Sequence, residues 1–534
     1  MSDALADASS GAASGTAWRG LDEPRAALVA ALITLVVGLA TITPDLIGVF
    51  FDDAIYVLIA QAIADGQGFV NPQLPGAPPA VHYPPLYPLL LAAVLKIAPP
   101  FPAGLAWVKF VNPVLLAFAA YGLTIGFVRW FALKPWQAML TVLAGTVSIP
   151  MHVLTTVVLS EPMFLALVAP AVLSADRLRR DDGLAAIVLA SVCGAAVMLA
   201  RTVGVVFVGA AFAALVLDRR WRAAAGYTIG VTLLLLPWQL FVWKHGAAYP
   251  PELAGSYGPY LAWVGGGYRA AGQGFVQDVL TKNLTDAWRF TGVVLTPGLA
   301  TSSMRPAAAV IAIVFACAGV AVGLLRPAAR VVTLGALGYL SIIAIWPFQV
   351  DRFLWAVWPL VLGFALYGAR DAWRSARRHE RRGAAVATAT VAAALVVGYT
   401  SYNVRGFSRG WASSASREMA RRTEPLIRYI NADPRLHGKV LAAEAAPMVA
   451  LYTRQQVIPV ERLDVQDHVR KKSPRESASV LSALDRRFEP DAYVMMSGGP
   501  HLLALLRTQM EPHRRFVEIT APGSPVRAFL SVEP

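Results

Sequence analysis

Long apolar runs constrain this chain more than any other feature of its sequence. Many segments of about 15 to 23 residues consist almost entirely of apolar side chains, which is the length that a helix needs to cross a bilayer. Because backbone N–H and C=O groups in lipid must be paired internally, such segments favour helices over barrel strands. With 56% hydrophobic and 15% charged residues among 534, the composition agrees with a polytopic helical membrane protein.

The apolar runs predict about eleven membrane spans. Their ranges are 26–48, 106–128, 136–157, 161–176, 184–200, 203–217, 223–242, 306–325, 331–347, 353–369 and 384–400. The first run is long for a signal-peptide core and predicts an uncleaved anchor. The run 84–98 is short and flanked by proline, and it could span, dip in and return, or lie at the interface.

Basic residues in the short loops favour one orientation. If 84–98 does not cross, sixteen Lys and Arg residues fall in loops on the amino-terminal side, and two, Arg201 and Arg352, fall opposite. The positive-inside rule then places the amino terminus in the cytoplasm and the carboxyl terminus outside. The same bias accounts for the net charge of +14, and no nucleic-acid-binding motif is present.

The chain divides into three parts by composition. Residues 1–18 predict a disordered cytoplasmic tail, 19–402 a transmembrane domain with outer loops at 50–105 and 243–305, and 403–534 a small extracytoplasmic α/β domain. In the last part, 439–443, 456–460 and 492–496 predict strands, and 417–430 and 477–487 predict helices. Its polar candidates are Glu444, Tyr452 and Arg454.

Polar side chains at the predicted outer ends of the spans mark a candidate site. They are Asp52, Asp53, Glu161, Arg201, Asp351 and Arg352. Acidic groups so close to a bilayer are costly unless they face water or a site. A carboxylate at the water interface suits a general base, and a guanidinium suits a phosphate, because it binds phosphate bidentately and stays charged.

The stretch that follows the first span has its own pattern. Residues 51–64 predict an amphipathic helix, with Asp53 and Tyr56 on one side. Gly66 and Gly68 end this helix. Three prolines between 84 and 88 then fix a rigid, extended approach to the next apolar helix.

These residues resemble the GT-C superfamily of membrane glycosyltransferases, in the branch of protein O-mannosyltransferases and lipid A aminoarabinose transferases. The matching motifs, in order, are Asp52-Asp53, Tyr56, Gly66-Gly68, Pro84-Pro85-Leu86-Tyr87, Ser160-Glu161-Pro162 and Asp351-Arg352-Phe353. The resemblance covers roughly residues 20–400. Many relatives carry Lys before Pro-Pro, whereas this chain has Tyr83, preceded by His82.

The resemblance implies a fold and an activity. The fold is mainly α, a polytopic membrane domain of GT-C type with juxtamembrane helices in the first outer loop. The activity is transfer of a sugar, with inversion, from a polyprenyl-phosphate donor to a glycolipid, polysaccharide or protein acceptor. It takes place on the outer face of the bacterial inner membrane. The implied partners are this lipid-linked sugar, the acceptor and the bilayer, without nucleic acid.

Each candidate residue has an expected role in that activity. Asp52 or Asp53 is the general base, and Glu161 orients the acceptor or helps to position the base. Arg352, then Arg201, and His82 in part, bind the donor phosphate. Tyr56, Tyr83, Tyr87 and Asp351 contact substrate. No His/Cys cluster has metal-ligand spacing, and no cofactor is expected, although adjacent carboxylates are able to hold a divalent cation.

Local structural roles compete with these interpretations. Asp52 and Asp53 could cap the short helix, and Glu161 is a natural residue for a first helical turn. Arg352 could pair with Asp351, and the tyrosines could form an interfacial aromatic belt. The alternative function is a transporter or flippase, or a non-catalytic sugar-binding membrane protein. The spans, however, are nearly uncharged, and no internal repeat is evident.

Overall fold

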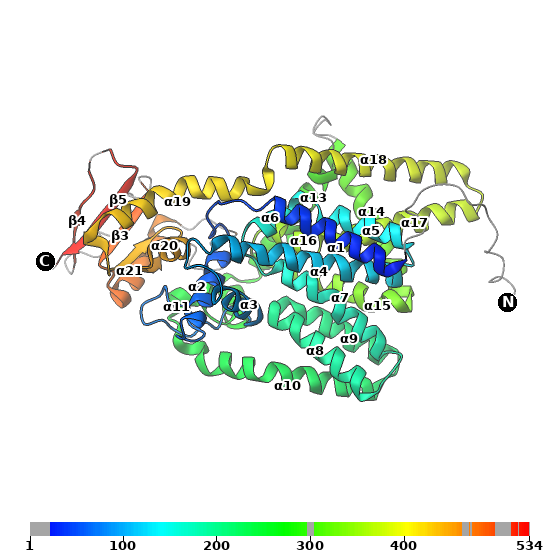
Figure 1. The fold of residues 1–534 in the computed structure, drawn as a ribbon, viewed down its shortest axis with the longest axis horizontal. Helices are drawn as coiled ribbons and strands as arrows, with labels where there is room; N and C mark the ends of the chain where they lie inside the picture. Colours follow the sequence, from blue (N-terminus) through cyan, green and yellow to red (C-terminus); the bar gives the residue numbers. More distant parts are fainter. Residues whose placement is uncertain are drawn as a thin grey trace.

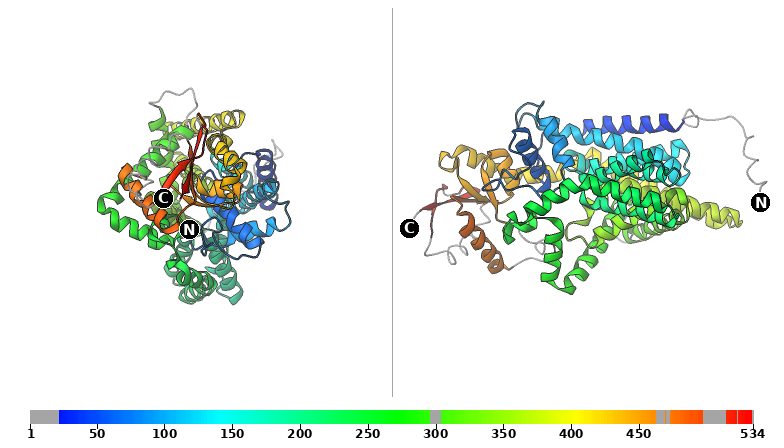
Figure 2. Two further views of the ribbon diagram at one scale, coloured as in Figure 1. Left: turned by 90° about the vertical axis from the view of Figure 1, so that its left-hand side faces the viewer. Right: turned by 90° about the horizontal axis from the view of Figure 1, so that it is seen from below.

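The protein is described by a computed structural model that covers residues 22–295, 304–461, 469, 473–496, 514–521 and 523–532. A bundle of long helices carries a small α/β domain at one end (Figures 1 and 2). The chain is therefore mainly helical, as predicted. The predicted disordered tail, 1–18, lies outside the described residues.

Each of the eleven predicted spans corresponds to a helix or to a bent pair of helices. They are α1 (Glu23–Ala40), α4 (Leu105–Phe131), α5 (Pro135–Thr146) with α6 (Ile149–Thr156), α7 (Glu161–Leu178), α8 (Leu184–Ala200), α9 (Val205–Leu217), α10 (Trp221–His245), α14 (Met304–Leu325), α15 (Arg330–Ala344), α16 (Val350–Ala356) with α17 (Trp358–Arg378), and α18 (Arg382–Ser408). Within the described residues, six helices are long and apolar enough to cross a membrane, or up to eight if each bent pair is one span. The chain is thus a multi-pass membrane protein, and the count of eleven stays a prediction.

Small residues allow close packing inside the bundle. Gly319 of α14 and Gly368 of α17 lie where the two helices touch, and a Cβ on Gly319 would lie 2.0 Å from the carbonyl oxygen of Phe364. A Cβ on Gly38 of α1 would likewise lie 2.9 Å from Pro113 of α4. Since lipid supplies no hydrophobic drive between spans, such backbone proximity is how membrane helices gain contact.

Two short helices follow α1 without crossing the bundle. These are α2 (Asp52–Ala64) and α3 (Leu86–Leu95). The ten residues of α3 extend about 15 Å, half of the hydrocarbon thickness of a bilayer. The segment 84–98 therefore does not cross as a helix, which was the condition for the predicted orientation. Gly66 follows α2 with φ +78°, as its predicted turn requires.

The basic loops gather at one end of the bundle, here called the basic end and defined by residues 129–134, 177–183, 218–222, 326–330 and 370–382. Asp218 binds Arg179 and Arg330, at 2.5 and 2.6 Å. Arg370 donates to the carbonyl oxygen of Ala132 at 3.0 Å. The loops with the excess of positive charge therefore meet one another, far from the α/β domain (Figure 1).

The second predicted outer loop, 243–305, is largely helical. It contains α11 (Pro251–Tyr257), α12 (Tyr260–Ala271) and α13 (Gln273–Leu295), while 296–303 lie outside the described residues. Asn283 of α13 donates to the carbonyl oxygens of Ile343 and Trp346, at 3.0 and 2.6 Å. Ile343 lies in the last turn of α15 and Trp346 lies two residues beyond it, so these bonds hold α13 beside the end of α15.

The C-terminal domain follows α18. It consists of α19 (Ser414–Ala432), β1 (Val440–Ala443), α20 (Ala446–Thr453), β2 (Gln456–Pro459), α21 (Pro474–Phe488), β3 (Ala492–Met496), β4 (Arg515–Glu518) and β5 (Val526–Val532). The sheet has the order β2-β1-β3-β5-β4, with β1 parallel to β2 and β3, and β5 antiparallel to β3 and β4. The predicted α/β character is confirmed, with α20 and α21 as the crossovers that parallel strands require.

Candidate active site

The loop between α1 and α2 holds a strained turn directly before Asp52. Phe51 has φ +70° and ψ −56°, and the Asp52 N–H donates to the carbonyl oxygen of Phe50 at 2.8 Å. This is a γ-turn with positive φ, a rare conformation for a side-chain-bearing residue. Such strain persists only where the surroundings enforce it, and it concentrates at functional sites.

Asp53, in the first turn of α2, holds the loop before this turn in place. Its carboxylate accepts hydrogen bonds from the N–H groups of Gly48, Val49 and Phe50, at 2.6, 3.0 and 3.0 Å, and its side chain is fully buried. Asp53 therefore has a local structural role, but this role differs from the expected helix cap, because its side chain binds the preceding loop and makes no capping hydrogen bond to α2. The structure separates the acidic pair, because Asp52 is the member that lines the cavity described next.

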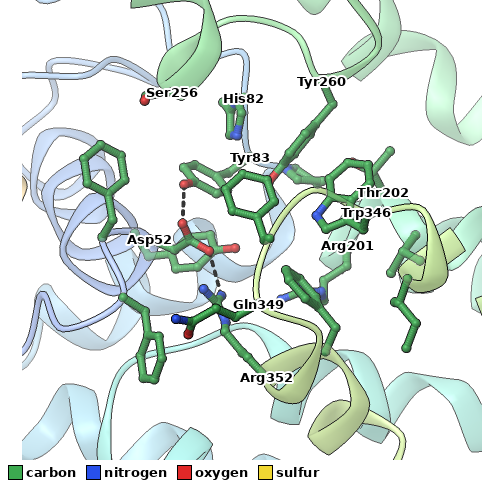
Figure 3. Close-up of a pocket in the computed structure, with 18 of the residues that line it drawn as sticks. Asp52, His82, Tyr83, Arg201, Thr202, Ser256, Tyr260, Trp346, Gln349 and Arg352 are labelled. Carbon is green, nitrogen blue, oxygen red and sulfur yellow. Dashed lines mark hydrogen bonds and ion pairs between the residues drawn. The ribbon is translucent and has the colours of Figure 1, made fainter. Parts of the chain in front are cut away.

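A cavity of about 660 Å³ opens where the first loop meets the later spans. Its wall includes Asp52, Tyr83, Arg201, Tyr260 and Arg352, as Figure 3 shows. These residues come from α2, the segment before α3, the end of α8, the start of α12, and α16. The wall is thus assembled from five segments that are distant in the sequence.

Four charged side chains form a continuous chain of ion pairs, in which Asp52, Arg201 and Arg352 line the cavity and Glu161 is buried behind them. Arg352 donates from Nη2 to Asp52 Oδ2 at 2.6 Å and from Nε to Glu161 Oε1 at 2.9 Å. Arg201 Nη1 lies 2.9 Å from the other oxygen of Glu161. Two positive and two negative charges therefore compensate one another where water is largely excluded, as buried charges must.

Asp52 is held as a carboxylate in this resting arrangement. Burial raises its pKa, but the charge of Arg352 and the hydrogen bonds from Tyr83 and Arg352 outweigh burial and hold the pKa below its ordinary value. The Tyr83 hydroxyl donates to Asp52 Oδ1 at 2.7 Å, so both carboxylate oxygens have a donor. Within the described part of the chain, no group of three or more His, Cys, Asp or Glu side chains is placed to hold a metal ion.

His82 lies at the same wall as a neutral ring. Its Nδ1–H donates to the carbonyl oxygen of Gly258 at 2.6 Å, and the ring lies 3.9 Å from that of Tyr260, centroid to centroid. Burial lowers the pKa of His82 to about 4. A ring that is neutral at pH 7 does not supply the positive charge that the expected partial role in phosphate binding requires.

Two of the remaining predicted residues line the cavity and two do not. Tyr56 lines it beside Tyr83, and its hydroxyl is 2.9 Å from Ser160 Oγ. Tyr87 is fully buried behind Tyr56 and donates to Asn112 Oδ1 at 2.8 Å, so the expected substrate contact is not supported. Asp351 is not part of the wall either, and the expected local pair with Arg352 is replaced by Asp52 and Glu161.

The wall also includes residues that sequence reasoning did not assign to the site. Val203, Ile342 and Phe348 make one side apolar. Glu418, Met419 and Arg422 come from α19, and they bring the start of the C-terminal domain to the cavity. Of these residues, only Phe348 had a signal in the sequence, because it lies close to Gln349 and Arg352. Nothing in the sequence of α19 indicates that this helix packs against the cavity.

No protein-family model matches the chain, and no curated protein sequence matches it. Solved structures with similar folds include ArnT from Cupriavidus metallidurans bound to undecaprenyl phosphate, at 13% identity over 94% of this chain and 97% of that chain, with a TM-score of 0.45. The Pmt1-Pmt2 protein O-mannosyltransferase complex of S. cerevisiae, bound to the sugar donor, matches at 16% identity over 44% and 36%, with a TM-score of 0.33. The mycobacterial arabinofuranosyltransferase AftD matches at 13% identity over 96% and 40%, with a TM-score of 0.42. With TM-scores below 0.5, these similarities leave the function of this chain to be inferred from its own residues.

Proposed function

We propose that the protein is a membrane glycosyltransferase. Its donor is a sugar on a polyprenyl phosphate, and its acceptor is a hydroxyl group of a cell-envelope glycolipid, polysaccharide or protein. The observation that carries the proposal is that Asp52, Arg352 and Arg201 line one cavity and are joined by ion pairs through the buried Glu161. A base and two phosphate-binding cations are the groups that this transfer needs.

The distribution of charge supports a reaction on the outer face of the bacterial inner membrane. The basic end of the bundle carries the arginine-rich loops that the positive-inside rule assigns to the cytoplasm. The C-terminal domain lies toward the opposite end of the bundle (Figure 1). Helices α2 and α19, which carry wall residues of the cavity, lie toward the same end. The proposed orientation therefore exposes the site and this domain to the extracytoplasmic side.

Asp52 is the general base of the proposed reaction. Its carboxylate takes the proton from the acceptor hydroxyl, whose oxygen attacks the anomeric carbon of the donor sugar. The bond between that carbon and the phosphate oxygen breaks, and its electron pair leaves with the polyprenyl phosphate. Because one displacement occurs at the anomeric carbon, the configuration inverts. Tyr83 orients the base by donating to Asp52 Oδ1.

Arg352 couples donor binding to activation of this base. In the resting site, its charge lowers the pKa of Asp52. A donor phosphate that shares the guanidinium weakens this effect, so the pKa of Asp52 rises and the carboxylate becomes a stronger base. Arg201 supplies the second positive charge, and the apolar side at Val203, Ile342 and Phe348 suits the first prenyl units.

The direct test compares cell-envelope glycans and glycolipids from cells that produce wild-type protein, Asp52→Asn or no protein. We expect a sugar modification that requires the wild-type protein and disappears in Asp52→Asn, with equal amounts of protein in the membrane. Asp45→Asn is the matched control, because Asp45 is a carboxylate in the same loop and is absent from the cavity wall. Full modification by Asp52→Asn would contradict the proposal.

A further inference from the structure

The C-terminal domain contacts the loop that presents Asp52. The N–H of Ile47 donates to the hydroxyl oxygen of Tyr452, in α20, at 3.0 Å. Next to it, Gly48 has φ +107°, and a Cβ at this position would lie 2.6 Å from Cβ of Met448, also in α20. Helix α20 therefore lies directly against the loop, with no room for a side chain between them.

The rest of the first outer loop carries further contacts to the same part of the domain. Arg454 donates from Nη2 to the carbonyl oxygen of Phe101 at 3.0 Å, and the Phe101 ring lies 5.1 Å from that of Tyr452. The N–H of Val457 in β2 donates to the carbonyl oxygen of Gln73 at 2.8 Å. Docking thus involves α20, its C-terminal end and the adjacent strand.

Side chains bind four successive backbone amides before the strained turn. Tyr452 binds the N–H of Ile47, and Asp53 binds those of Gly48, Val49 and Phe50. Directly after Phe50, the chain passes through the γ-turn at Phe51 and reaches Asp52. The backbone that positions Asp52 is therefore fixed at one end by the membrane domain and at the other by the C-terminal domain.

We infer that the C-terminal domain is a working part of the active site, and that Tyr452 is a positioning residue for Asp52. This inference rests on the proposed function, in which Asp52 is the base. The C-terminal domain holds the loop in the conformation that points Asp52 at Arg352 and the cavity. Displacement of a reacting group by about 1 Å is enough to reduce a rate about 100-fold, so a hydrogen bond remote from substrate acts on the rate.

Tyr452→Phe tests the inference, because it removes the hydroxyl and keeps the ring against Phe101. Tyr493→Phe is the matched control. The hydroxyl of Tyr493 is buried in the same domain, and it donates to Asp485 Oδ1 at 2.8 Å, within the domain. Both variants are made in the full-length protein in lipid nanodiscs. Two quantities are measured: hydrogen–deuterium exchange of residues 47–50, and kcat and KM for the lipid-linked donor.

In Tyr452→Phe we expect exchange at 47–50 to accelerate about tenfold and kcat to fall about tenfold, with KM for the donor within about twofold of wild type. KM for the donor should be unchanged because Arg201 and Arg352, which bind the donor phosphate in the proposed reaction, keep their positions. Tyr493→Phe should change neither exchange at 47–50 nor kcat. An unchanged kcat in Tyr452→Phe, or the same changes in Tyr493→Phe, overturns the inference. Absence of sugar transfer by the wild-type protein overturns the proposed function instead, and exchange alone then decides whether Tyr452 holds the loop.

Discussion

Arg352 donates to Asp52 at 2.6 Å although 300 positions separate the two residues in the sequence. The guanidinium comes from α16, and the carboxylate comes from the first turn of α2. Because Arg352 is buried and Asp52 is half-buried, each needs the other to offset its lost hydration. The pair therefore joins the first outer loop to the late part of the membrane domain, and it places the proposed base beside the cation that we propose binds the leaving phosphate.

Replacing the two adjacent aspartates should give different outcomes. Asp52→Asn removes the proposed base, so we expect the transfer rate to fall about 100- to 10,000-fold. We expect a smaller loss of thermal stability than in Asp53→Asn, because Arg352 keeps Glu161 as an ionic partner. Asp53→Asn removes the charge that accepts three N–H groups, so we expect a lower apparent melting temperature as well as lower activity. Single-turnover transfer and thermal unfolding in nanodiscs measure both quantities. Equal loss of stability in the two variants would argue against the separation of their roles.

The sequence was sufficient to predict that Asp52, Glu161, Arg201 and Arg352 belong to one site. Each follows or begins an apolar run, and the charge bias places these ends on one face, which predicts that they share a site; their direct ion pairs depend on how the helices pack. The sequence could not choose between Asp52 and Asp53. Neighbouring residues on a helix point about 100° apart, and the loop conformation decides which one faces the cavity.

Other parts of the site depend on tertiary packing that leaves no local signal. Tyr87 belongs to the same motif as Pro84 and Pro85, but α3 turns it toward Asn112 and away from the cavity. The contribution of α19 to the wall depends on how the C-terminal domain docks, which hydrophobic periodicity does not specify. His82 has the right position for a cation, but its burial removes the charge.

Arg352→Lys should weaken donor binding and slow transfer. A lysine ammonium replaces the planar fork that reaches Asp52 and Glu161 at once, and it binds phosphate as a point charge. We expect at least tenfold weaker binding of undecaprenyl phosphate and about 100-fold slower transfer. The control is Arg370→Lys at the basic end, which should match wild type in both measurements. Wild-type binding by Arg352→Lys would contradict the assignment of the phosphate to this residue.

The buried His82 should make the protein sensitive to mild acid. Its pKa is about 4 in the folded protein, below the ordinary value of 6.5, so the unfolded chain binds its proton first as the pH falls. The folded state therefore loses stability between pH 6.5 and pH 4, and the loss levels off below that. His82→Gln keeps an amide donor for Gly258 and cannot titrate. We expect its melting temperature to fall less than that of wild type between pH 7 and pH 4.5, and parallel curves would contradict this.

Gly48→Ala should damage the site more than the same change at another glycine with positive φ. Gly48 has φ +107° and Gly68 has φ +89°, so alanine is strained by about 1–2 kcal/mol at either position. They differ in surroundings, because an added Cβ meets Met448 at Gly48 but nothing within 4 Å at Gly68. Backbone strain alone therefore predicts similar losses of kcat in the two variants, whereas the contact with α20 predicts a larger loss of kcat in Gly48→Ala. We expect Gly48→Ala to lower kcat at least tenfold more than Gly68→Ala, because its Cβ pushes the Asp52 loop from the C-terminal domain. Equal activities would show that α20 gives way without moving the base.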